Sequence, residues 1–220
     1  PARGLISGTV GRQGGFLPQL PLANRSRAIW GRLPELIGED VEFLQAGHLR
    51  VSYRREDADV AEQYARDCKP YGLELEILSA NAVRDRFPYL GPEVMLGSYS
   101  ASDGHANPRL AAPAFARAAR RAGATVIEGV GVTGIEKAGE DFVVATDTRG
   151  EFRAPVVQIS AAAWGNDLSA TFGEPVPLVP HGPQMGVTEA RPYALAPTLG
   201  VVSSKASEGI YPRQVKRGNV

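Results

Sequence analysis

The sequence predicts a mixed α/β fold of the α+β kind, in which helices and antiparallel strands share a core. Helical periodicity and strand alternation follow one another along the chain, and no internal repeat separates them. Hydrophobic residues make up 43% of the 220 residues and charged residues 22%, which is an ordinary globular composition. A dense series of strand patterns follows the clearest helix, so a helical bundle or a solenoid is excluded.

The first hundred residues predict a loop followed by alternating helices and strands. Glycines crowd residues 4–20 and indicate a loop whose backbone approaches a ligand or another segment closely. The expected elements are a helix at 21–37, a strand at 48–53, a helix at 57–71, a short amphipathic turn at 79–90 and a strand at 94–100. Asp57 is the expected cap of the second helix.

The clearest helix is predicted at 107–122. Asn107 is a good N-cap, and Pro108 suits the first helical position. Gly123 is expected to end the helix. Pro113 lies inside it and removes one hydrogen bond, so the helix should bend there.

After this helix the sequence predicts mainly strands. They are expected at 125–128, 130–137, 142–146 and 156–160, then, after a short helix at 165–172, at 183–189, 200–203 and 209–211. Residues 129–134 match the G-x-G-x-x-G string of dinucleotide-binding loops. That chemistry requires a helix directly after the string, whereas the residues that follow continue a strand pattern. We therefore expect no phosphate loop there; a nicotinamide-dependent dehydrogenase would need that helix.

Charge and cysteine content exclude several classes of site. Lys and Arg (24) balance Asp and Glu (24), so nothing steers the chain toward nucleic acid. The single Cys68 excludes an intrachain disulfide framework and favours a reducing, cytoplasmic setting. His48, His105 and His181 are too scattered for a metal site. No apolar run predicts a transmembrane segment.

Several short motifs follow one another along the chain, and their order identifies a protein family more specifically than any single motif does. They are Gly11-Arg12-Gln13-Gly14-Gly15, Ser102 to Pro108, Glu128 to Glu136, Ser160 to Gly165, Gln184 to Glu189, and Ile210 to Gln214 with Gly218 to Val220. In this order the chain resembles the D-amino-acid oxidase-like (DAO) family of FAD-dependent oxidoreductases. This family includes glycine and sarcosine oxidases and the flavin subunits of opine oxidase, hydroxyproline dehydrogenase and hydrogen cyanide synthase.

The resemblance implies two domains. Residues 1–45 and 101–175 would form parts of an FAD-binding domain of the glutathione-reductase/DAO type, and residues 46–100 and 176–220 an antiparallel-sheet substrate domain. The chain begins at Pro1 and ends at Val220 in an apolar segment. We therefore expect an internal fragment without the N-terminal dinucleotide-binding unit and the C-terminal flavin segment, inactive and weak in FAD binding by itself.

The resemblance also implies site residues. The cofactor would meet Arg12, Gln13, Gly14, Gly15, Val132, Ala161, Ala162, Ala163 and Trp164. Glycine backbone and a permanent charge suit anionic oxygens. The family motif A-A-G-A-W carries a glycine where this chain has alanine. A substrate carboxylate would bind Arg213 beside Tyr211, with Arg217 as the alternate.

The implied function is oxidation of the C–N bond of an amino acid or secondary amine by hydride transfer to flavin. The partners would be a small-molecule amine and, by analogy with the family's subunits, other dehydrogenase subunits in a hetero-oligomer. A non-catalytic remnant that keeps the fold but no longer holds FAD is the alternative.

Overall fold

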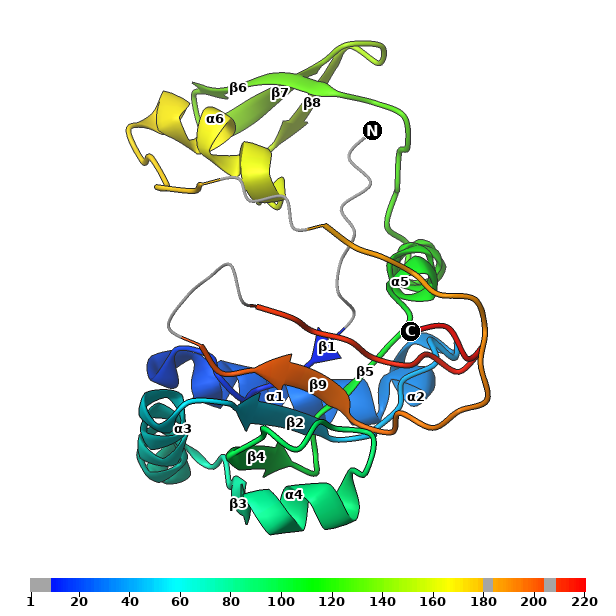
Figure 1. Cartoon of the computed structure of the whole chain (residues 1–220). Coiled ribbons are helices and arrows are strands. Elements are labelled where there is room, and N and C mark those ends of the chain that lie inside the picture. Colours follow the sequence, from blue (N-terminus) through cyan, green and yellow to red (C-terminus); the bar gives the residue numbers. More distant parts are fainter. Residues whose placement is uncertain (1–8, 180–183, 204–208) are drawn as a thin grey trace. The chain divides into compact units, whose positions relative to one another are not determined.

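The computed structural model describes residues 9–179, 184–203 and 209–220. Its contacts divide the chain into two compact units (Figure 1). The main unit comprises the described residues within 4–124 and 186–220, and the meander unit those within 125–185. Within the described chain, no helix has both the length and the apolar character to cross a membrane.

A four-stranded sheet is the centre of the main unit. Its strands lie in the order β3 (Glu76–Ser79), β4 (Leu96–Ser100), β2 (His48–Ser52) and β9 (Thr198–Val201). β2 runs antiparallel to β4 and parallel to β9, and β3 runs antiparallel to β4. Because side chains alternate along a strand, the two faces of this sheet differ in character.

One face of the sheet is apolar. Its buried residues are Leu49, Val51, Leu78 and Leu199, packed with Val83, Phe87 and Val94. Val83 lies on α4 (Ala80–Arg86), which runs along this face in Figure 1. The α4 helix begins at a Ser79 cap, whose side chain accepts a hydrogen bond from the Ala82 nitrogen.

The other face is polar, and we call it the polar face. It carries His48, Arg50, Ser52, Ser98, Ser100 and Thr198, which alternate with the apolar residues in the register. At the Ser52 end it is covered by α3 (Arg55–Cys68), where Ala58 and Ala61 pack on Leu96. The prediction that Asp57 caps this helix was wrong, because α3 begins at Arg55 and Arg54 occupies the N-cap position. The Arg54 guanidinium lies 2.8 Å from the Asp57 carboxylate, which is buried in the first turn.

The remaining helices of the main unit form a second core. They are α1 (Leu20–Gly31), α2 (Leu33–Ile37) and α5 (Pro108–Arg121), with the 3-10 turns Leu17–Gln19 and Lys69–Tyr71. The core comprises Leu33, Ile37, Val41, Ala106, Ala111 and Ala114. The Asn107 side chain caps α5 as predicted, and Pro113 lies within it. Gly123, with φ +93°, ends it through paired backbone hydrogen bonds. The short strands β1 (Thr9–Val10) and β5 (Gly104–His105) pair antiparallel.

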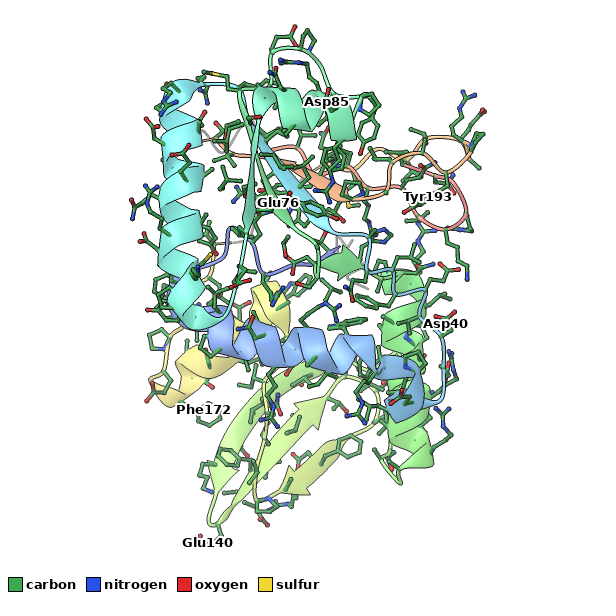
Figure 2. The ribbon with its side chains drawn as sticks, turned by 90° about the horizontal axis from the view of Figure 1, so that it is seen from below. Asp40, Glu76, Asp85, Glu140, Phe172 and Tyr193 are labelled. Carbon is green, nitrogen blue, oxygen red and sulfur yellow. The ribbon has the colours of Figure 1, made fainter. Side chains whose placement is uncertain are left out.

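The meander unit is a three-stranded antiparallel sheet followed by short helices. Its elements are β6 (Val132–Ala138), β7 (Asp141–Thr146), β8 (Glu151–Ala154), the 3-10 turns Ala162–Trp164 and Ala170–Phe172, and α6 (Gly165–Ser169) between them. Figure 2 shows Glu140 at the tip of the first hairpin. The residues after Gly134 continue β6, with a bulge near Val132. The string at 129–134 is therefore not a phosphate loop, which excludes the nicotinamide interpretation.

Four expected strands were wrong. The structure has no strand at 125–128, at 156–160, in the described part of 183–189, or at 209–211. Their apolar residues suit a strand, but a strand also needs a regular hydrogen-bonded ladder. Between the two C-terminal segments, the buried Gln214 amide accepts hydrogen bonds from the nitrogens of Ala194 and Leu195 and donates to the carbonyls of Arg191, Pro192 and Gly218. β8, conversely, was missed.

Candidate cofactor and substrate site

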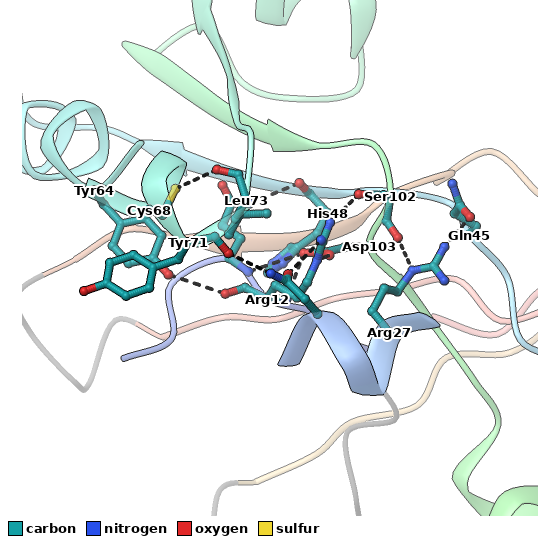
Figure 3. A network of polar contacts seen from close by, with 12 residues as sticks. Arg12, Arg27, Gln45, His48, Tyr64, Cys68, Tyr71, Leu73, Ser102 and Asp103 are labelled. Carbon is teal, nitrogen blue, oxygen red and sulfur yellow. Dashed lines mark hydrogen bonds and ion pairs between the residues drawn. The ribbon is translucent and has the colours of Figure 1, made fainter. Parts of the chain in front are cut away.

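The loop at residues 11–15 is held by one buried carboxylate. Asp103, whose side chain is fully buried, accepts hydrogen bonds from the Arg12 nitrogen at 2.9 Å and from Arg12 Nε at 2.8 Å (Figure 3). The Gln13 nitrogen donates to it at 3.3 Å. Successive backbone N–H groups plus a guanidinium form an anion-binding concavity, and here the anion belongs to the chain.

The Arg12 guanidinium has two further partners inside the chain. It donates to Asn24 Oδ1 at 3.0 Å and to Ser102 Oγ. All three of its nitrogens are therefore engaged, so it fixes the loop against the segment at 102–103. Asp103 lies within the motif from Ser102 to Pro108, but the sequence does not indicate its role, because Arg12 and Asp103 lie 91 positions apart.

Gln13 joins the loop to the polar face. Its amide donates to the His48 carbonyl at 3.1 Å and accepts from Ser98 Oγ. Tyr64 on α3 donates to the Gly15 carbonyl at 3.0 Å, and burial raises the pKa of this tyrosine. Side-chain hydrogen bonds of Gln13 and Tyr64 therefore join the loop to the sheet and to α3.

Gly11 and Arg12 line a pocket of about 370 Å³ in the main unit. Its other lining residues come from β1, α1, α5 and the segment just before α5, and they are mostly apolar: Thr9, Val10, Ala23, Ser26, Arg27, Trp30, Ala106, Pro108, Ala111, Ala112 and Phe115. Trp30 and Phe115 meet edge to face, with ring centroids 6.3 Å apart. Ligand pockets commonly combine such an apolar lining with a few polar groups at one end.

The polar face holds buried polar atoms that find no hydrogen-bond partner among the described residues. They include both ring nitrogens of His48, Arg50 Nε, Ser52 Oγ, Ser100 Oγ and Thr198 Oγ1. Burial lowers the pKa of His48 to about 4, opposed by the Asp103 charge and reinforced by Arg50. His48 is therefore neutral at pH 7. Such groups are normally satisfied by water or by a ligand.

The predicted substrate residues lie in different surroundings. A Cβ built on Gly200 would lie 3.2 Å from the Tyr211 ring and 3.3 Å from His48 Nε2, so Tyr211 borders the polar face. Arg213 instead donates to the Ala106 carbonyl at 2.8 Å, and burial lowers its pKa. Arg217 is exposed.

The remaining predicted residues belong to the meander unit. Val132 opens β6 opposite Thr146, and Trp164 is 55% exposed. Ala161, Ala162 and Ala163 lead into the 3-10 turn, and Ala162 has φ +48°. This left-handed conformation favours glycine, which is consistent with the glycine of the A-A-G-A-W motif.

Comparison with known proteins places this geometry in context. A family model described as FAD dependent oxidoreductase (DAO) matches residues 2–220. Human mitochondrial sarcosine dehydrogenase is 31% identical over 199 residues, which cover 84% of this chain and 22% of that protein. Sarcosine oxidase subunit beta of Arthrobacter sp is 29% identical over 171 residues, covering 75% of this chain and 42% of that subunit.

A solved structure shares the fold. Glycine oxidase from Geobacillus kaustophilus superposes with a TM-score of 0.80 at 24% identity, covering 97% of this chain and 58% of that one. The chain thus spans about a fifth to two fifths of the length of these two curated relatives.

Proposed function

Because the chain belongs to the DAO family of FAD-dependent oxidoreductases, we propose that its protein oxidises the C–N bond of an amino acid or secondary amine. The observation that carries this proposal is the family match over residues 2–220. The predicted fold class, a mixed α/β fold of the DAO and glycine oxidase type, is confirmed. The names of the two curated relatives, which specify sarcosine, support a small amine that bears a carboxylate.

We propose that the main unit binds part of an FAD molecule. The pocket of about 370 Å³ falls within the usual range for ligand sites, roughly 300–1,000 Å³. Its apolar walls suit a flat aromatic ring system, and Gly11 leaves main chain without a side chain at its rim. The Arg12 guanidinium is bound inside the chain, so we propose that the loop Arg12–Gly15 contributes main-chain atoms rather than this charge.

The other cofactor contacts remain predictions. In the meander unit we propose Val132, Ala161, Ala162, Ala163 and Trp164 for this role, as the family resemblance implies. The assignment of residues 1–45 and 101–175 to an FAD-binding domain is likewise a proposal. For residues 1–220 alone we expect weak FAD binding and no activity.

FAD, when bound, would accept the hydride from the substrate Cα–H or N-methyl carbon and leave an imine that water hydrolyses. The chain's own residues position the substrate and exclude water. Tyr211 lies beside the neutral His48, where it can pack against the substrate. This chemistry requires no catalytic triad from the protein.

Assembly and location are further proposals. One relative is named as a subunit, so we propose that this protein also works within a hetero-oligomer. The cytoplasmic location rests on the single cysteine, which is buried.

The visible spectrum of the full-length protein tests the function. Bound oxidised flavin should absorb near roughly 450 nm and bleach when sarcosine or glycine is added without oxygen. Ala112→Trp should fill the pocket and lower the flavin content. Ala116→Trp, on the same helix outside the pocket lining, should leave it unchanged. A colourless full-length protein would support the non-catalytic remnant instead.

A further inference from the structure

Arg50 occupies the middle of the polar face. In the sheet register it lies opposite Ser98 of β4 and Gly200 of β9, and the three strands lie side by side in Figure 1. Its neighbour Gly200 has no side chain, so nothing from β9 fills the space beside the arginine. The guanidinium extends toward the loop, since a Cβ built on Gly14 would lie 2.8 Å from Arg50 Cζ.

Arg50 has no acidic partner among the described residues, whereas several other arginines of the main unit have one. Arg12 pairs with Asp103, Arg54 with Asp57, and Arg117 with Glu39. Within the described residues no ion pair involves Arg50, and its Nε is buried without a hydrogen-bond partner. Arg50 is partly buried, and a buried donor nitrogen that lacks an acceptor is destabilising unless a ligand or water supplies one.

We propose that Arg50 binds the carboxylate of a small organic acid on the polar face. A planar guanidinium matches the two oxygens of a carboxylate, which gives both strength and orientation. This inference rests on the proposed function only in naming that carboxylate as the one carried by the amino-acid substrate. It differs from the sequence prediction, which assigned this role to Arg213.

The groups around Arg50 favour a single negative charge. His48 is neutral, and the Tyr64 hydroxyl lies near enough for the Arg50 charge to act on it. Tyr211 closes the side next to Gly200. One guanidinium among neutral groups balances a carboxylate, whereas a phosphate dianion would need further cations. The glycine loop beside Arg50 is also the segment proposed to border the cofactor.

Thermal unfolding of the full-length protein in acetate tests the assignment. Acetate should raise the melting temperature more than acetamide, its uncharged counterpart, at constant ionic strength. Arg50→Gln should weaken acetate binding at least about tenfold, because a charge-assisted hydrogen bond is lost. Arg84→Gln is the matched control, since Arg84 is an exposed cation on α4, against the opposite face of the same sheet.

A second variant, Arg50→Lys, and a comparison with inorganic phosphate test the proposal even if Arg50→Gln does not fold. Arg50→Lys retains the charge but loses the two-pronged geometry, so it should bind acetate with intermediate affinity and should fold even if Arg50→Gln does not. An acetate effect unchanged in Arg50→Lys and Arg50→Gln would overturn the proposal. So would inorganic phosphate that binds more tightly than acetate through Arg50, because it would mark a phosphate site.

These outcomes are separable from the proposed function. Acetate binding is measured without reference to flavin, so a protein that lacks flavin yet binds acetate through Arg50 would refute only the oxidoreductase proposal. A protein that holds flavin, but whose stabilisation by acetate is unchanged when Arg50 is substituted, would refute only the proposal that Arg50 binds a carboxylate.

Discussion

Substitution of Asp103 by Asn tests whether one carboxylate holds the loop at 11–15. The change leaves the shape of the side chain but removes its charge. The Arg12 side chain, 12% exposed, would then lose its only acidic partner among the described residues, and the backbone nitrogens of Arg12 and Gln13 would face a weaker acceptor. Removing one member of a buried ion pair destabilises a protein by about 3–5 kcal/mol.

We expect the lower end of that range, about 3 kcal/mol, because Arg12 keeps its bonds to Asn24 and Ser102 and the amide still accepts one hydrogen bond. With a urea dependence of about 2 kcal/mol per molar, the midpoint should fall by about 1.5 M. The two units need not unfold together, so a reporter within the main unit is required. Trp30 supplies it in a Trp164→Phe background, since the chain has two tryptophans.

Asp59→Asn is the control. Asp59 pairs with Arg55 at 2.9 Å, but both side chains are more than half exposed, and such pairs contribute at most about 1 kcal/mol. If Asp103→Asn shifts the Trp30 midpoint no more than this control does, Asp103 does not hold the loop. An Arg12→Met, Asp103→Leu double variant should recover part of the loss, since it leaves no unpaired charge.

Three further predictions concern single positions in the main and meander units. Burial lowers the pKa of His48 to about 4 from 6.5, so its contribution to stability is full above pH 6.5 and is lost as the pH falls toward 4. Between pH 7 and pH 4.5 the unfolding free energy, measured by urea titration, should therefore fall by on the order of 2 kcal/mol more in the wild type than in His48→Gln. If the unfolding free energies of the two proteins depend on pH in the same way, His48 is not the titrating group. Pro113→Ala should restore a hydrogen bond in α5, which stabilises the fold by about 1–2 kcal/mol and raises the melting temperature. A lower melting temperature would show that α5 requires the proline. Gly104→Ala should lower the free energy of unfolding by more than about 2 kcal/mol, because the new Cβ would overlap the Leu44 carbonyl and lie 3.0 Å from Gln45 Cα. Gly134→Ala, whose Cβ meets nothing within 4 Å, should lower it by less than about 1 kcal/mol. Equal losses in the two variants would contradict this prediction.

Local signals predicted the helices well. Asn107, Pro108 and Gly123 act within one or two turns of their own backbone, so the sequence contains everything needed to place α5. The G-x-G-x-x-G string could be dismissed for the same reason, since the strand pattern that contradicts it follows immediately. The strands at 156–160 and 209–211 failed because a ladder depends on a partner that the local pattern does not contain.

The site was predicted only in part. The order of motifs located the loop at 11–15, and the structure brings Tyr211 to the polar face. The order of motifs could not show that Asp103 accepts the hydrogen bonds of Arg12, nor that Arg50 Nε has no hydrogen-bond partner among the described residues. Both facts depend on which distant side chains meet, and an arginine on a strand looks the same in a sequence whether it is paired or not.

The parallel pairing of β2 with β9 sets the order in which the chain can fold during synthesis. Residue 48 pairs with residue 198, so the four-stranded sheet is completed only after the residues between them have been made. The meander unit lies between β2 and β9 in the sequence and contains only local strand pairings, so it can fold before the sheet of the main unit is complete. During that interval the outer edge of β2 is an open template on which a strand of another nascent chain could pair. By pairing with β2, β9 therefore also protects the four-stranded sheet from aggregation.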